Sequence, residues 1–60
     1  MGDRHGEATA LLILADVAAA AAQHPRAREY LAEAARLQER HQWPSVAPLL
    51  ARVAAGLAAD

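Results

Sequence analysis

Residues 11–34 read LLILADVAAAAAQHPRAREYLAEA, and this stretch decides the fold of the 60-residue chain. Small residues recur in it at helical spacing, at Ala15, Ala18, Ala27 and Ala34. Larger aliphatic residues accompany them, at Leu11, Leu14 and Leu31. A helix brings residues three and four apart onto one face, and alanine on that face lets a neighbouring backbone approach closely. The spacing therefore predicts two helices that lie very close together.

The composition predicts a thin hydrophobic core. Hydrophobic residues make up 55% of the chain, but eighteen of them are alanine. A domain of this size buries only about 60% of its unfolded surface. Its folding free energy is close to zero, because apolar burial and the entropy lost on ordering the chain nearly cancel. The chain has no cysteine, so neither disulfides nor a thiolate zinc site can support it. We therefore expect self-association or docking onto a larger protein.

The charge pattern argues against a nucleic-acid partner. Six arginines and seven carboxylates give a formal net charge of −1, whereas nucleic-acid binding needs a basic excess on one face. Arg36 and Arg40 stand at i,i+4, but Glu29, Glu33 and Glu39 interleave with them. This arrangement is typical of a solvated helix face with ion pairs.

The apolar run from Ala8 to Gln23 is not a membrane span. A spanning helix needs about 20 apolar residues, whereas this run is shorter and carries Asp16 near its middle. We therefore expect a cytoplasmic protein. Asp16 has two interpretations. In the first, it pairs with an arginine of a partner across an interface. In the second, which the pattern favours, it lies with Leu12, Ala19 and Gln23 on the one solvent-exposed (wet) edge of the first helix.

The periodicity predicts three helices in one domain, over about 7–22, 25–41 and 45–58, behind a flexible N-terminus over 1–6. The predicted fold class is an all-α three-helix module: a helical hairpin plus a third packing helix, completed by self-association.

Two short breaks separate these helices. Residues 23–24 form the first, because Pro25 suits the first turn of a helix and disfavours helical geometry in the residue before it. Residues 42–44 form the second, after which Ser45 can cap a helix whose first turn tolerates Pro48. Trp43 either anchors a partner or, as the neighbouring proline favours, closes this corner as a hydrophobic plug.

The second and third helices each show one apolar stripe toward the core. The stripe of the second is Ala27, Tyr30, Leu31, Ala34, Leu37 and Gln38, and that of the third is Val46, Leu49, Leu50, Val53 and Leu57. Stripes of this kind are typical of amphipathic surface helices.

The first helix is apolar nearly all round. Leu11, Leu14, Val17 and Ala18 lie on one side, and Leu12, Ile13, Ala20 and Ala21 cover much of the rest. Such a helix is normally buried on more than one face, and two partner helices cannot cover it. We therefore predict a contact between chains, made by Leu12, Ile13, Val17, Leu49, Val53 and Leu57.

The small and large positions of the hairpin also follow a repeat pattern. Leu11, Leu14-Ala15 and Ala18 suit its first helix, Ala27, Leu31 and Ala34 its second, and Leu50, Val53-Ala54 and Leu57 would open the next unit. In these positions, about three quarters of the chain resembles the tetratricopeptide repeat, most of all the degenerate, alanine-rich repeats of large bacterial transcription activators. The first-helix aromatic is absent, and Glu39 stands where the family has proline. The resemblance implies a scaffold for protein–protein contact.

Candidate chemistry is sparse. No two of His5, His24 and His41 are three or four apart, as a helical zinc site would require. Arg36 and His41 resemble the Arg-x4-His pair of a family of helical ribonucleases, which need a larger bundle. We predict no metal, no cofactor and no small-molecule substrate.

The sequence therefore predicts a non-catalytic protein–protein interaction or assembly module. Its partner is a second copy of itself, and another protein is a further candidate. One alternative is a docking or adaptor segment of a larger multienzyme or transcription-regulator assembly. A small helical ribonuclease using Arg36 and His41 is the less favoured one.

Overall fold

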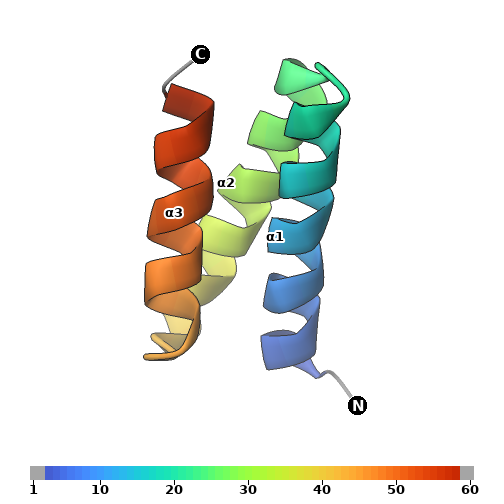
Figure 1. The fold of residues 1–60 in the computed structure, drawn as a ribbon. Helices are drawn as coiled ribbons and strands as arrows, with labels where there is room; N and C mark the ends of the chain where they lie inside the picture. Colours follow the sequence, from blue (N-terminus) through green and yellow to red (C-terminus); the bar gives the residue numbers. More distant parts are fainter. Residues whose placement is uncertain (1–2, 59–60) are drawn as a thin grey trace.

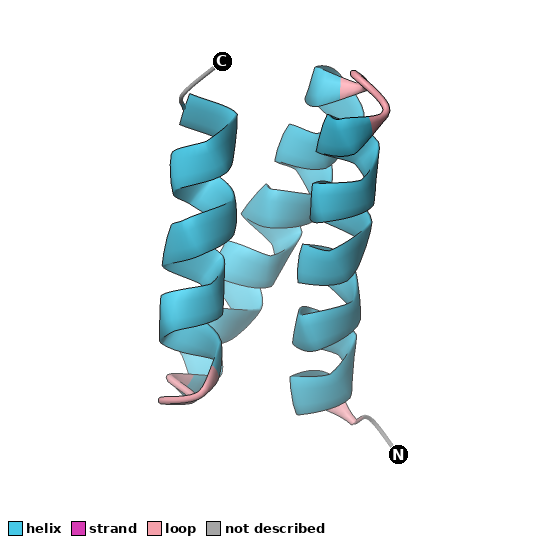
Figure 2. Ribbon diagram, in the orientation of Figure 1, coloured by secondary structure: helices cyan, strands magenta, loops and turns pink. Residues whose placement is uncertain are grey.

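Three helices run up, down and up in the computed structural model, which describes residues 3–58 (Figure 1). They are α1 (Arg4–Ala20), α2 (His24–His41) and α3 (Val46–Ala58). α1 and α2 form an antiparallel hairpin, and α3 returns parallel to α1. The described residues are helical except at the short turns and the N-terminal cap (Figure 2), so the predicted all-α three-helix module is confirmed. None of these three helices is long and apolar enough to cross a membrane.

Alanines hold the α1/α2 pair together. Ala15, Ala18, Ala27 and Ala34 are all buried, as the spacing predicts, and Ala8 is buried with them. α1 and α2 contact each other far more extensively than either contacts α3. Because five of the eight buried hydrophobic residues within 3–58 are alanine, the core is as thin as the composition predicts.

The few larger buried side chains lie where α3 meets the hairpin. Leu12 and Val46 pack with Ala34 near one end, and Leu57 packs with Ala18 and Ala27 near the other. Half-buried residues surround these two clusters, namely Leu11, Tyr30, Leu31, Trp43, Leu49, Leu50 and Val53. The apolar stripes predicted for the second and third helices are therefore confirmed.

The rotation of α1 about its own axis differs from the expectation. Leu12, predicted to lie on the wet edge with Asp16, is only 1% exposed, whereas Leu14, predicted to face the hairpin, is 44% exposed. A helix that is apolar all round does not fix its own rotation. The close packing of alanines between α1 and α2 fixes the rotation, because a helix turned to bury Ala8 and Ala15 against α2 presents position 14 to solvent.

α1 begins three residues before the predicted start, so residues 4–6 of the predicted flexible N-terminus are helical, and residues 1 and 2 lie outside the described part. The Asp3 carboxylate accepts a hydrogen bond of 3.0 Å from the Gly6 N–H and caps α1, which begins at Arg4. A Cβ at Gly6 would lie close to this carboxylate, so a larger residue at position 6 would require the Asp3 side chain to shift. Glu7 lies in the first turn, where the helix dipole favours a negative charge.

The first interhelical turn is a left-handed C-cap. Ala22 has φ 62°, the Gln23 N–H donates to Ala18 O (2.8 Å), and the Ala22 N–H donates to Ala19 O (3.0 Å). This is the Schellman pattern, with alanine where glycine is usual. It ends α1 at Ala20, two residues before the predicted end, and makes His24 the first residue of α2 rather than part of the turn.

The second turn closes in a similar way. Gln42 is left-handed, with φ 54°, and its N–H donates to Gln38 O at 2.6 Å. Val46 then begins α3 directly after Ser45, and Pro48 lies in its first turn as predicted. The two turns leave α1 and α3 parallel on one side of the molecule, with α2 behind them (Figure 1).

Candidate interaction surface

A groove of about 500 Å³ runs between the parallel helices α1 and α3. α1 contributes Leu12, Ile13, Asp16, Ala19 and Ala20 to it, and α3 contributes Leu49, Arg52, Val53, Gly56 and Leu57. The groove exists because the alanine seam draws α1 toward α2, while α3 contacts α1 much less extensively. Its lining is apolar except for one acidic and one basic side chain.

An exposed apolar strip continues the groove around α1. Ile13 is 56% exposed, Leu14 44% and Val17 60%. These are the large hydrophobic side chains most exposed among residues 3–58, and all three lie on α1. Because Ile13 also lines the groove, the strip adjoins the groove at this residue. Val17 and Leu14 then lie further around α1, at about 40° and 100° from Ile13. We call the groove and its exposed edge the α1/α3 surface, defined by the groove residues together with Val17.

The six residues predicted to form the interface all lie on or under the α1/α3 surface. Ile13 and Val17 are exposed, and Leu49 and Val53 are half-buried in the wall of the groove. Leu12 and Leu57 differ, because they are 1% and 5% exposed and belong to the chain's own core. They form the floor of the groove, so most of their surface is already buried within the chain.

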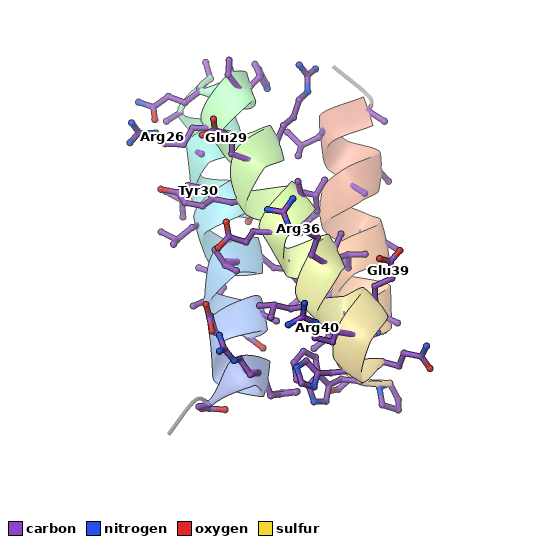
Figure 3. The ribbon with its side chains drawn as sticks, turned by 180° about the vertical axis from the view of Figure 1, so that it is seen from behind. Arg26, Glu29, Tyr30, Arg36, Glu39 and Arg40 are labelled. Atoms are coloured by element: carbon purple, nitrogen blue, oxygen red, sulfur yellow. The ribbon has the colours of Figure 1, made fainter. Side chains whose placement is uncertain are left out.

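The opposite side of the molecule is a charged face on α2. Figure 3 shows Arg26, Glu29, Arg36, Glu39 and Arg40 along this helix. Arg36 lies 3.8 Å from Glu33 in an exposed i,i+3 pair, which stabilises the helix only slightly. The four arginines and three glutamates of α2 interleave, and this arrangement agrees with a solvated face.

Trp43 forms a second cluster at the corner between α2 and α3. It is half-buried against the cluster of Leu12, Ala34 and Val46. The Gln38 side chain fixes its backbone, with Nε2 donating to Trp43 O (2.9 Å) and Oε1 accepting from the Trp43 N–H (3.2 Å). The plug interpretation of Trp43 therefore agrees with its packing.

Two histidines complete the corner. The His41 ring stacks on Trp43 with centroids 4.6 Å apart, and the His5 ring meets Trp43 edge-on at 5.3 Å. The His5 Nε2 also lies 3.0 Å from the Ser45 hydroxyl oxygen. Sequence reasoning missed this contact between the first turn of α1 and the start of α3, because nothing in the local pattern links residues 40 apart.

The structure does not bring the predicted ribonuclease pair together. Arg36 lies beside Glu33, whereas His41 is stacked on Trp43. Five residues of helix separate their side chains by about 140° around the axis. Likewise, no group of three or more potential metal ligands gathers anywhere in residues 3–58.

Comparison with known protein families, curated proteins and solved structures finds no match to this chain. The tetratricopeptide resemblance therefore stays a prediction, carried by the order and spacing of the hairpin residues.

Proposed function

We propose that this chain is a cytoplasmic, non-catalytic assembly module that self-associates through the α1/α3 surface. The observation that carries the proposal is the exposed apolar strip on α1, where Ile13 and Val17 are more than half exposed beside an apolar groove. A continuous apolar patch rimmed by polar residues commonly marks a protein–protein contact.

The thin core supports the same proposal. The core contains three buried side chains larger than alanine among residues 3–58. Self-association would supply the apolar burial that this thin core lacks.

The strength of association follows from the side chains that would be covered. Full burial of a Val, Leu or Ile stabilises by about 1.5–3 kcal/mol, and the side chains of the strip are roughly half exposed. Each would contribute about 1 kcal/mol. Because association itself costs several kcal/mol in lost freedom, we expect a reversible, concentration-dependent complex rather than a permanent one.

Sedimentation and helicity measured across a dilution series, from about 1 mM to about 1 μM, test the proposal. We expect mass to fall on dilution, and helicity to fall with it. Ile13→Asp places a charge on the exposed strip and should abolish the larger species. Val53→Asp should do the same from the other wall, and Glu33→Ala on α2 should leave association unchanged.

Two results would contradict the proposal. The first is a fully helical monomer at the highest concentration. The second is an Ile13→Asp variant that keeps both its helicity and its wild-type mass. A chain that stays monomeric but forms a stable complex with a different protein would support the adaptor alternative instead.

A further inference from the structure

The two walls of the groove run in the same direction (Figure 1). Leu12 of α1 packs in one cluster with Val46 of α3, and Ala18 packs in the other with Leu57. Asp16 lies between the two α1 positions, Arg52 lies between the two α3 positions, and both line the same groove. The two charges therefore lie along the same stretch of the groove.

Asp16 and Arg52 are the charged residues in the lining of this groove, one on each wall. Both are exposed. Within residues 3–58 neither takes part in an ion pair. The α1/α3 surface therefore carries one negative and one positive charge, one on each wall of the apolar groove. A surface of this kind is electrostatically complementary to a second copy of itself.

Two-fold symmetry allows two ways to place such faces together, and the charges distinguish them. If the axis runs along the groove, α1 of one copy faces α3 of the other in parallel, and Asp16 lies opposite the partner's Arg52 twice. If the axis runs across the groove, α1 faces α1 in antiparallel fashion. When that axis passes at the height of the two charges, Asp16 lies near the partner's Asp16, and Arg52 near the partner's Arg52, which is unfavourable.

We propose that two copies of this chain form a parallel two-fold dimer with the axis along the groove, in which Asp16 of each copy pairs with the partner's Arg52. This inference rests on the proposed function, and it adds the partner's orientation and the pair that selects it. The exposed Ile13 then packs against the wall of the partner's α3.

The size of the face suits a reversible dimer. The two longest extents of the Cα trace are 32 and 20 Å, so one face offers about 640 Å² in projection. Two such faces can bury at most about 1,300 Å², which lies at the lower end of the range for stable interfaces. The interface is therefore small enough for two ion pairs to affect the affinity of the dimer.

Charge reversal tests the pairing. Asp16→Arg and Arg52→Asp should each raise the dissociation constant about tenfold, because each turns two attractive pairs into two repulsive ones. The double variant carrying both changes should return to within about threefold of the wild type. Glu39→Arg on α2 is the matched control, and circular dichroism should show equal helicity throughout. In an antiparallel dimer the single variants would bind like the wild type.

Disulfide trapping tests the orientation independently. The chain has no cysteine, so single-cysteine variants are unambiguous. In the parallel dimer Ala20→Cys mixed with Gly56→Cys should give a covalent heterodimer on oxidation, because the two positions face each other across the interface. Ala32→Cys on the charged face, mixed with Gly56→Cys, should not.

The outcomes separate the two proposals. A wild-type chain that stays monomeric overturns both. In the antiparallel arrangement α1 faces the partner's α1, so Ala20→Cys should cross-link to Ile13→Cys. A dimer that gives this cross-link, is disrupted by Ile13→Asp and is unaffected by charge reversal overturns the parallel arrangement alone. Charge sensitivity with rescue, together with the Ala20→Cys to Gly56→Cys cross-link, supports it.

Discussion

Ala34→Leu is the most direct test of the alanine seam. Ala34 is fully buried on α2, and it packs in one cluster with Leu12 and Val46, which are each 1% exposed. Three added carbon atoms would stabilise the fold by about 2.4 kcal/mol if there were room for them. Because the helices are in contact at this position, the added atoms must instead push α1 and α3 away.

Overpacking of this kind typically costs about 1–3 kcal/mol. In a 60-residue domain each kcal/mol shifts the thermal midpoint by about 4–8 °C. We therefore expect Ala34→Leu to lower the free energy of unfolding by about 2 kcal/mol and the midpoint by about 8–16 °C. A domain of this size has only about 3–5 kcal/mol in total, so the loss is large.

Thermal unfolding followed by circular dichroism measures the change, with all variants at one protein concentration because association raises the midpoint. Ala32→Leu is the matched control. Ala32 is exposed on the same helix, alanine and leucine have similar helix propensities, and the expected change is within about 0.5 kcal/mol. An Ala34→Leu variant as stable as the Ala32→Leu variant would refute close approach of the helices as the basis of the core.

Three further predictions concern the ends of the helices. Ala22→Gly should stabilise the chain by about 1 kcal/mol, because residue 22 has a left-handed backbone conformation. Ala32→Gly, within α2, should destabilise the chain by a similar amount. Thermal midpoints that shift in the same direction in both variants would contradict this prediction. Asp3→Ala should cost about 1 kcal/mol through loss of the cap, and Asp3→Asn much less; equal midpoints for the two variants would argue against capping. Gln38→Ala should lower the free energy of unfolding by about 1–2 kcal/mol. It should also shift the fluorescence emission of Trp43, the only tryptophan, toward that of a solvated indole. An unchanged spectrum would show that the two hydrogen bonds from Gln38 do not hold Trp43 in place.

Much of the fold could be predicted because its determinants are local. The small-residue spacing places Ala15, Ala18, Ala27 and Ala34 at the seam, and all four are buried. Pro25 lies in the first turn of α2, within one position of where the sequence places it, and the second and third helices show their stripes clearly. Each of these signals depends on a few neighbouring residues.

The rest depends on contacts that no local pattern shows. An all-apolar first helix gives no preferred rotation, so the exchange between buried Leu12 and exposed Leu14 follows only from the packed bundle. The sequence predicts a flexible start, yet the short side chain of Asp3 accepts a hydrogen bond from the Gly6 N–H and caps α1. The contact of His5 with Ser45 joins the first turn of α1 to the segment just before α3, which is 40 residues away in the sequence.

The apolar groove could be predicted only in part. The residues that line its walls follow from the stripe of α3 and the excess of apolar surface on α1, and five of the six predicted interface residues line it. The depth at which each side chain lies does not follow from the sequence. Leu12 and Leu57, predicted as interface residues, lie at the floor of the groove and are buried. The juxtaposition of Asp16 and Arg52 requires the parallel return of α3, which sequence spacing alone does not specify.

The most extensive packing in this molecule joins two helices that follow each other directly along the chain, through a turn of three residues. Contacts between chain neighbours close with little loss of entropy, and proteins rich in them fold within microseconds to milliseconds. We therefore expect the hairpin to form before α3 docks onto it, so that the exposed apolar strip of α1 is already in place in the first compact state of the chain.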